Sequence, residues 1–116
     1  MERKGIFHMQ PFTQQVVMII KNIPEGKVMT YGQIARLAGS PRAARQVVRI
    51  LHSMSKKHRL PWHRVINAKG QISIQDDSSY HDQILSLQSE GVKVSETGMV
   101  CLDKYQWHPE GIEISN

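Results

Sequence analysis

Residues 61–66, with the sequence Pro-Trp-His-Arg-Val-Ile, bring side chains that could do chemistry into one short segment. His63 could act in proton transfer together with a carboxylate, as it would in a hydrolase. Its neighbour Trp62 is not a nucleophile, because an indole N–H only donates hydrogen bonds and has no nucleophilic lone pair at neutral pH. Covalent chemistry would therefore need a nucleophile from elsewhere in the chain.

Cys101, the one cysteine of the chain, is the candidate for that role. It lies in the apolar, strand-like run 99–102, which predicts a buried thiol, and a buried thiol without a positive neighbour is inert. A single cysteine also excludes an intramolecular disulfide and is typical of a reducing compartment. His52, His58 and His63 match no common zinc-ligand spacing. We therefore expect neither a metal nor another cofactor.

Composition places the chain among small, basic, globular proteins. Its 116 residues suffice for one domain, 1–116, and its net charge is +5, from 15 basic and 10 acidic residues. That charge favours a polyanionic partner such as nucleic acid but does not by itself establish one. The longest apolar run, 16–20, is too short to cross a bilayer, and the N-terminus does not resemble a signal peptide. We expect a cytoplasmic protein, associated with the nucleoid if bacterial, with no membrane partner.

A helix-turn-helix is predicted in the first half of the chain. Thr30 and Gln33 have capping-box spacing at the start of a short helix, and Gly39 is suited to the C-terminal end of that helix. Ser40 and Pro41 then suit the N-cap and the first position of a second helix. Two helices joined across so short a turn are typical of this DNA-binding motif.

The second of these helices should have one apolar and one basic face. Arg42, Arg45 and Arg49 follow each other at i, i+3 and i+7, so they share the face opposite the apolar one. Such a stripe on a recognition helix suits phosphate contacts, although an isolated stripe is more often a solvated surface. The apolar face would consist of Ala44, Val47, Val48, Leu51 and Met54.

The remaining elements are predicted to be short. A helix over 11–23 precedes the motif, a polar and basic loop over 55–60 follows it, and a helix over 79–90 ends at Gly91. The segments 65–67 and 71–73 flank a turn and suggest a hairpin. Two further strand candidates, 92–94 and 100–102, lie near the C-terminus. The fold class is mostly α with short β hairpins around a helix-turn-helix, and is winged-helix-like.

Four segments resemble the O6-alkylguanine-DNA alkyltransferases, in order and at that family's spacing. They span about Phe12 to Glu90, and Trp62 occupies the position of the nucleophilic cysteine, a pattern similar to that of the alkyltransferase-like proteins. The resemblance implies the fold of the alkyltransferase C-terminal domain and a DNA-binding protein without transferase activity. The segments are Ile23–Val28 with Thr30–Ala35, Ala44–Val48, Pro61–Ile66 and Glu90–Gly91.

The resemblance also implies how DNA would be bound. Arg45 would be the finger that enters the duplex from the minor groove and fills the gap left by a flipped base. Tyr31 would press on the phosphate 3′ of the target nucleotide. Ala43 and Ala44 are small enough to let the helix approach the groove closely. The other DNA-facing residues would be Arg42, Gln46 and Arg49.

The flipped alkylguanine would enter a lesion pocket. The resemblance assigns this pocket to Tyr31, Trp62, Val65, Ile74 and Gln75. Trp62 would pack against the alkyl group. Gln75 stands where some alkyltransferase-like proteins carry an arginine, and Met54 stands where the active enzymes usually carry an asparagine. His63 and Glu90 would be the remnant of a proton relay, and Arg64 would anchor the loop.

The implied function is that of a monomeric, non-enzymatic damage sensor. It would bind O6-alkylguanine in double-stranded DNA without alkyl transfer and flag the lesion for nucleotide excision repair proteins. Two alternatives remain open at this point. One is an enzyme, either an alkyltransferase that uses Cys101 or a hydrolase that uses His63 and Glu90. The other is a helix-turn-helix regulator that recognises base sequence in the major groove.

Overall fold

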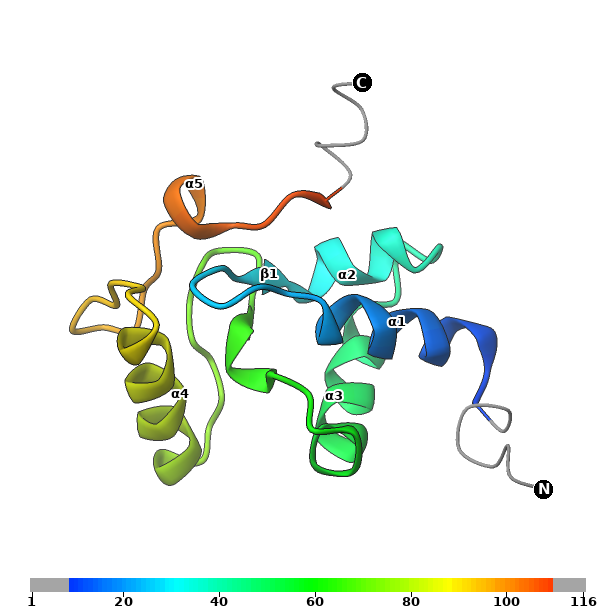
Figure 1. Ribbon diagram of the computed structural model, residues 1–116, viewed down its shortest axis with the longest axis horizontal. Coiled ribbons are helices and arrows are strands. Elements are labelled where there is room, and N and C mark those ends of the chain that lie inside the picture. The colour runs from blue at the N-terminus through cyan, green and yellow to red at the C-terminus, as the bar shows by residue number, and fades with distance from the viewer. Residues whose placement is uncertain (1–8, 110–116) are drawn as a thin grey trace.

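The computed structural model of the protein describes residues 9–109. In Figure 1, α1, α2 and α3 lie together on one side of the molecule and α4 lies on the other. No helix in the described range is long and apolar enough to cross a membrane. In chain order the elements are α1 (Pro11–Lys21), β1 (Met29–Thr30), α2 (Tyr31–Leu37), α3 (Ala44–His58), the 3-10 helix η2 (Trp62–Arg64), β2 (Val65–Ile66), α4 (Asp77–Ser89) and α5 (Leu102–Tyr105).

The two short strands join two hydrophobic clusters. β1 pairs with β2 in parallel, with Met29 opposite Val65. Because successive side chains of extended backbone point to opposite faces, Met29 and Val65 enter the first cluster, while Val28 and Ile66 enter the second. The first cluster is Val16, Val17, Ile20, Ile23, Met29, Ile34, Ala35, Val47, Ile50, Leu51, Leu60 and Val65. The second is Val28, Ile66, Ile72, Leu87, Val92, Val100 and Tyr105.

The predicted capping box forms at the start of α2. The Thr30 hydroxyl accepts a hydrogen bond from the Gln33 amide at 3.1 Å, and the Gln33 side chain accepts one from the Thr30 amide at 3.2 Å. Gly39 follows the last turn with φ +98°, a conformation that suits glycine. The N-terminal helix is also confirmed, ending at Lys21 ahead of Pro24.

The predicted start of α3 is wrong. Ser40 closes the end of α2 instead of capping α3, because its amide donates to the Ala35 carbonyl while the Gly39 amide donates to Arg36. These two hydrogen bonds form a Schellman motif, in which Ser40 belongs to the C-terminal end of α2 and not to the start of α3. Pro41 and Arg42 therefore lie in a turn, and α3 begins at Ala44.

The predicted loop over residues 55–60 is also mostly wrong, because α3 continues to His58. Lys56, Lys57 and His58 occupy its last turn, where basic side chains face the negative end of the helix dipole. Arg59 then ends the helix with φ 53°. Polarity and charge in this segment mark an exposed last turn.

The second half of the chain contains less regular β structure than predicted. A turn over 67–71 is present, but β2 pairs with β1 and not with 71–73. Antiparallel pairing near the C-terminus is limited to the bridges Gln71–Met99 and Val94–Val100, and Leu102 begins α5. α4 starts at Asp77, two residues earlier than predicted, because Asp76 accepts a hydrogen bond from the Ser79 amide at 2.9 Å.

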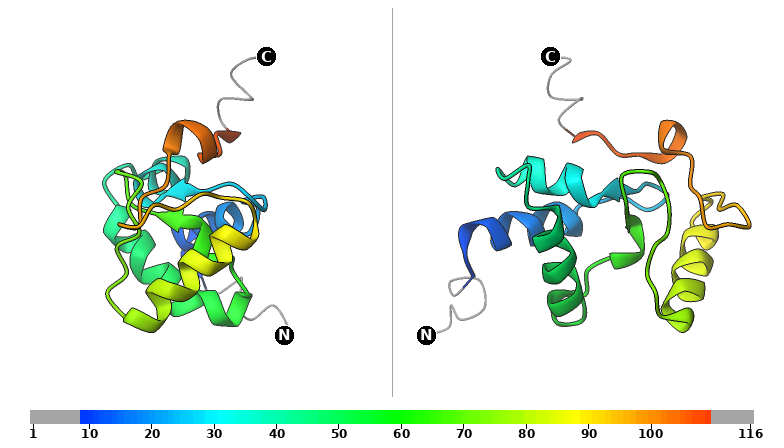
Figure 2. Two further views of the ribbon diagram at one scale, coloured as in Figure 1. Left: turned by 90° about the vertical axis from the view of Figure 1, so that its left-hand side faces the viewer. Right: turned by 180° about the vertical axis from the view of Figure 1, so that it is seen from behind.

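The segment after α5 returns to the helix-turn-helix. In Figure 2 it runs back over β1 towards α2. The Trp107 amide donates to the Val28 carbonyl at 2.8 Å, and the Gln33 side chain donates to the Trp107 carbonyl. Trp107 packs on the first cluster. Gln33, which completes the capping box of α2, therefore also holds the C-terminal segment in place.

A candidate DNA interface with a side cavity

The N-terminal part of α3 presents basic side chains to solvent. Arg45, Gln46 and Arg49 are exposed on the helix, and Arg42 is exposed in the preceding turn, so Arg42 is not on the helical stripe where it was predicted. The N-cap, Ala43, has no side-chain cap, and the first turn contains no acid. The unneutralised positive end of the helix dipole and the nearby arginines together favour an anion such as a phosphate group.

Val48 departs from the predicted apolar face of α3. The buried positions are Val47, Ile50 and Leu51, whereas the Val48 side chain is 44% exposed. Ala43 and Ala44 are half-buried, and Ala43 packs on the first cluster. An exposed valine among arginines is not required by the core, and Val48 instead lies on the wall of a cavity.

The cavity beside α3 has a volume of about 560 Å³, which is within the usual range for small-ligand sites. Four residues of the predicted lesion pocket line it: Tyr31, Trp62, Ile74 and Gln75. The fifth, Val65, does not, because its side chain is only 1% exposed and belongs to the first cluster. The other lining residues are Val48, Leu51, His52, Ser55, Ser73, Ser79 and Gln83.

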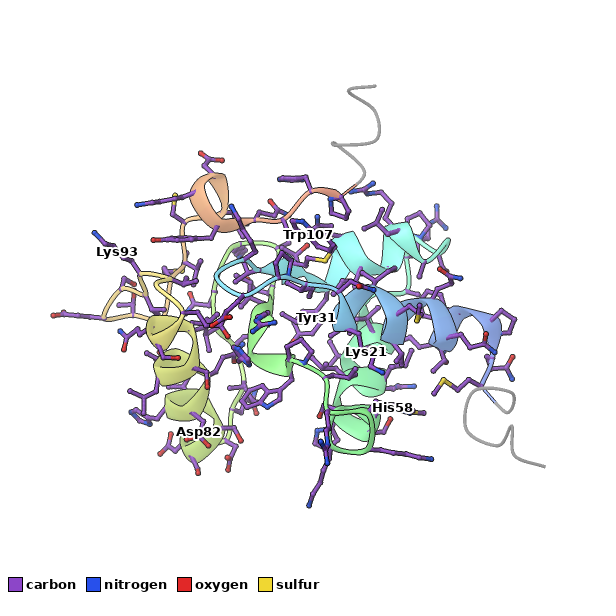
Figure 3. The ribbon with its side chains drawn as sticks, viewed as in Figure 1. Lys21, Tyr31, His58, Asp82, Lys93 and Trp107 are labelled. Atoms are coloured by element: carbon purple, nitrogen blue, oxygen red, sulfur yellow. The ribbon has the colours of Figure 1, made fainter. Side chains whose placement is uncertain are left out.

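Tyr31 is the first residue of α2 and lies at the centre of the molecule, as Figure 3 shows. The capping box at Thr30 fixes the backbone from which this side chain enters the cavity. Burial raises the pKa of the Tyr31 hydroxyl, because the phenolate would lose hydration. Tyr31 therefore stays protonated and can donate a hydrogen bond to an anion or a base.

Trp62 enters the cavity from the single turn of η2. The Trp62 amide donates to the Leu60 carbonyl at 2.8 Å, and the Arg64 amide donates to the Pro61 carbonyl at 3.0 Å. The Trp62 and His63 rings meet edge to face, with their centroids 6.4 Å apart. The tight turn separates the two side chains, so the indole lines the cavity while His63 turns towards Glu90.

Glu90 holds this turn in place from the end of α4. Its carboxylate accepts hydrogen bonds from Arg64 Nη2 at 2.7 Å, from the Gly26 amide at 2.9 Å, and from His63 Nε2 at 2.7 Å. Burial opposes ionisation of Glu90, but the donors from Arg64, Gly26 and His63 outweigh it and lower the pKa to about 2. Arg64 also donates to the Ile23 carbonyl at 2.8 Å. Arg64 is thus the internal anchor that the sequence predicted.

Cys101 differs from the prediction because it is exposed. It precedes α5 instead of continuing a strand, and its side chain is exposed although its neighbours Val100 and Leu102 pack in the second cluster. It does not line the cavity that Trp62 enters. Within residues 9–109, no three His, Cys, Asp or Glu side chains are grouped in a way that could hold a metal ion.

Several cavity residues were not predicted from the sequence. His52 and Ser55 lie on α3 at i+4 and i+7 from Val48, so helical spacing could have grouped them on one face once Val48 was known to be exposed. Gln83 is buried at 3% exposure, and its amide nitrogen lies 3.1 Å from the carbonyl oxygens of both His63 and Val65. Only the folded arrangement of α4 against η2 reveals that contact.

A helix-turn-helix with a basic, uncapped second helix beside a cavity defines a DNA-binding domain of the alkyltransferase type. The comparison with known families agrees: residues 11–92 match the family "6-O-methylguanine DNA methyltransferase, DNA binding domain". The chain belongs to this family.

The relatives include proteins named for their behaviour on DNA. The chain is 47% identical over 97 residues to the DNA base-flipping protein of Escherichia coli, covering 84% of this chain and 74% of that protein. It is 40% identical over 106 residues to Alkyltransferase-like protein 1 of Schizosaccharomyces pombe, covering 87% and 98%. The structure of S. pombe Atl1 in complex with damaged DNA containing O6-carboxymethylguanine matches with a TM-score of 0.78 and 38% identity, covering 88% and 99%. The fold is alkyltransferase-like.

Proposed function

We propose that this protein binds O6-alkylguanine in duplex DNA, turns the damaged nucleotide into the cavity, and holds it without removing the alkyl group. The observation that carries the proposal is the position of Trp62. Its indole lines a cavity of about 560 Å³ directly beside the basic helix α3. A flat apolar ring at this position can contact an alkyl group, but it has no electron pair with which to accept one.

The exposed side chains of α3 and of the turn before it would have different roles in DNA binding. Arg42 and Arg49 would contact phosphates on either side of the inserted helix, and Gln46 would face the groove. Arg45, in the first turn, would enter the stack and occupy the space of the flipped nucleotide. Tyr31, protonated and at the cavity, would donate to the adjacent phosphate.

The absence of alkyl transfer is part of this proposal. Cys101 lies outside the cavity lining, and His63 is paired with Glu90, whose carboxylate also binds Arg64. The pair therefore supports the loop and has no thiol to activate. Two relatives are named as base-flipping and alkyltransferase-like proteins, which supports a role in binding.

A long-lived complex with the lesion would recruit repair proteins. A monomer seated on the lesion would hold the DNA in a distorted form, and that form would flag the site for nucleotide excision repair proteins. The same complex would exclude authentic alkyltransferases from the lesion.

The test is a titration of the protein into two otherwise identical duplexes, one of which contains a single O6-methylguanine. Salt is held constant, because phosphate contacts make the affinity strongly salt-dependent. We expect tighter binding to the lesion, and intact O6-methylguanine in the DNA when it is digested and weighed by mass spectrometry afterwards. Equal affinity for both duplexes would refute the proposal and leave a general DNA-binding domain. Loss of the methyl group would instead show an enzyme.

A matched variant tests the role of Trp62. Trp62→Ala should keep the affinity for undamaged DNA and lose most of the preference for the lesion. Trp107→Ala is a control for loss of a large aromatic side chain elsewhere, because Trp107 packs on the first cluster and does not line the cavity.

A further inference from the structure

A second hollow in the surface lies between α5 and the segment that precedes it. It has a volume of about 570 Å³ and is called the α5 groove below, and its lining comes from residues 93–95, 99–101 and 104–105. In Figure 1, α5 lies on the α4 side of the molecule. No residue of the α5 groove belongs to α3 or lines the cavity that Trp62 enters. The two hollows are therefore separate sites.

The floor of the α5 groove is apolar although it is open to solvent. Val100 is buried in the second cluster, and side chains of extended backbone alternate, so Met99 and Cys101 on either side of it share the outer face. Met99 is 36% exposed and Cys101 is exposed, and both line the groove. The core uses neither side chain, so they leave an apolar strip that a partner can cover.

Two lysines and no acid line the α5 groove. Lys93 and Lys104 are exposed, and within residues 9–109 neither forms an ion pair. Tyr105 contacts both residues, because its hydroxyl accepts a hydrogen bond from the Lys93 amide at 3.2 Å and its ring centroid lies 5.5 Å from Lys104 Nζ. The acids Glu96 and Asp103 are nearby in sequence but do not line the groove. The groove therefore has a positive rim.

The Tyr105 hydroxyl adds a hydrogen-bond donor to this rim. Tyr105 is only 8% exposed, and in the part of the chain that the structure describes its O–H donates to no acceptor. Buried polar groups are nearly always hydrogen-bonded. A carboxylate that enters the groove can accept this hydrogen bond, and the lysines can balance its charge.

We propose that the α5 groove is a docking site for an acidic segment of another protein, in which Asp or Glu residues flank apolar side chains. The apolar side chains would cover Met99 and Cys101. The carboxylates would meet Lys93, Lys104 and the Tyr105 hydroxyl. An apolar floor inside a charged rim is the usual composition of a protein–protein contact, whereas the backbone of a DNA duplex offers negative charge without apolar side chains.

This inference goes beyond the proposed function and does not depend on it. Because the α5 groove shares no residue with α3 or with the cavity, the protein can hold DNA and the acidic segment at the same time.

Cys101 makes occupancy of the α5 groove measurable, because it is the one cysteine of the chain and is exposed in the groove. The neutral reagent iodoacetamide alkylates it, and mass spectrometry of the full chain gives the rate with and without a probe. The probe is the peptide acetyl-Gly-Asp-Leu-Glu-Phe-Gly-amide. A second peptide has Asn and Gln in place of Asp and Glu, and a third has Ser in place of Leu and Phe.

The acidic peptide at about 1 mM should slow alkylation of Cys101 roughly fivefold, as for a dissociation constant of a few tenths of a millimolar. Each of the other two peptides lacks half of the recognised chemistry and should slow it less than about twofold. No protection by the acidic peptide would refute the inference. Equal protection by the amide peptide would also refute it, because the lysines would then play no part.

A pair of lysine variants tests the positive rim. Lys104→Glu should reduce the protection to less than about twofold, because it replaces attraction with repulsion, while Lys104→Arg should retain it. Lys21→Glu makes the same change in net charge on α1, outside the groove, and should keep the fivefold protection. Each ratio compares one variant with and without peptide, so a changed thiol reactivity cancels. Equal losses in Lys104→Glu and Lys21→Glu would show a response to net charge alone and contradict the inference.

Two further measurements examine other occupants of the α5 groove. An undamaged duplex at a saturating concentration should leave the alkylation rate unchanged, and the peptide should still protect Cys101 when that duplex is bound. Protection by the duplex itself would make the groove part of the DNA interface and overturn the inference. Protection that rises with protein concentration, without any probe, would place a second copy of the chain there and overturn it as well. None of these measurements contains a lesion, so the loss of lesion preference that would refute the proposed function leaves their outcome unchanged.

Discussion

The two walls of the cavity are built by different means. The α3 wall consists of Val48, Leu51, His52 and Ser55, whose positions follow from the repeat of a regular helix. The opposite wall, with Trp62 and Gln83, depends on side-chain hydrogen bonds between segments that are 18 to 64 residues apart in sequence. A substitution on the α3 wall therefore changes one lining residue and leaves the others in place. Removing an anchoring residue of the opposite wall should instead displace Trp62 and Gln83 together.

The two walls therefore differ in role, because one can contact DNA and the other is held by hydrogen bonds within the protein. Val48 and His52 on the α3 wall, and the arginines at the N-terminal end of α3, are exposed to solvent, where they can meet DNA. On the side of the other wall, the hydrogen bonds of Glu90, Arg64 and the Gln83 amide nitrogen are made within the protein. A change on the α3 side should therefore alter which DNA is bound, and a change at the anchor should alter folding.

The largest expected effect is the loss of stability in Glu90→Ala. The substitution leaves the charged Arg64 and the Gly26 amide without their acceptor in a side-chain environment that is mostly buried. We expect a loss of about 3 kcal/mol or more in the free energy of unfolding, as for other broken buried ion pairs. Urea denaturation measures it, with the exposed Glu96→Ala as the control. A loss below about 1 kcal/mol would show that the anchor is dispensable.

The next effect should appear in lesion preference when Arg45 is replaced. Arg45→Ala removes the side chain that would fill the space of the flipped nucleotide, so the ratio of lesion to undamaged affinity should fall roughly tenfold to thirtyfold. Arg49→Ala should weaken both duplexes alike and reduce the salt slope by about 1, because it would lose only a phosphate contact. If the two variants behave identically, Arg45 has no special role in the duplex.

Some parts of the fold and of the site follow from the sequence, and others do not. The helix-turn-helix, the capping box at Thr30 and the anchoring role of Arg64 were predicted, and the structure has all three. These depend on local patterns or on family motifs. The predicted start of α3 was wrong because Ser40 could close one helix or open the next, and local spacing does not decide between them. Gln83 was not predicted because its partners, His63 and Val65, become neighbours only through folding.

The exposure of Cys101 and Val48 shows the same limit. Cys101 lies in an apolar run and Val48 at an apolar position of the helical repeat, so burial was predicted for both, and both are exposed. An apolar residue on a helix or beside one is buried only if another element covers it, and that depends on the tertiary arrangement. The exposed Val48 side chain lines the cavity, which is a contact that the sequence does not reveal.

A smaller effect should accompany acidification. The folded state lowers the pKa of Glu90 to about 2, so it favours the ionised carboxylate. The resulting stabilisation is complete above the ordinary pKa of a glutamic acid, about 4.3, and is lost as the pH falls towards 2. Allowing for solvent screening, we expect the free energy of unfolding to fall by about 1 to 2 kcal/mol between pH 6 and pH 3 from this residue. Urea titrations at both pH values measure it, and Glu90→Gln should show a smaller pH dependence than the unaltered protein.

The smallest expected effect concerns the α3 wall alone. Val48→Ser replaces an exposed residue with one of similar helix propensity, so the free energy of unfolding should change by less than about 0.5 kcal/mol. If Val48 contacts the alkyl group, the variant should lose affinity for a duplex with a large apolar lesion, such as O6-benzylguanine. Removing part of one apolar contact should weaken that binding about twofold to threefold, and binding to O6-methylguanine by less.

Leu85→Ser separates this effect from a general loss of surface hydrophobicity. Leu85 is 64% exposed on α4 and does not line the cavity, so its replacement should leave both lesions bound as before. A loss in Val48→Ser that is equal for benzyl, methyl and undamaged DNA would place Val48 in contact with the DNA backbone and not with the lesion. A loss that grows with the size of the alkyl group would show that the α3 wall sets the lesion range independently of the anchored wall, because Glu90, Arg64 and Gln83 are unchanged in this variant.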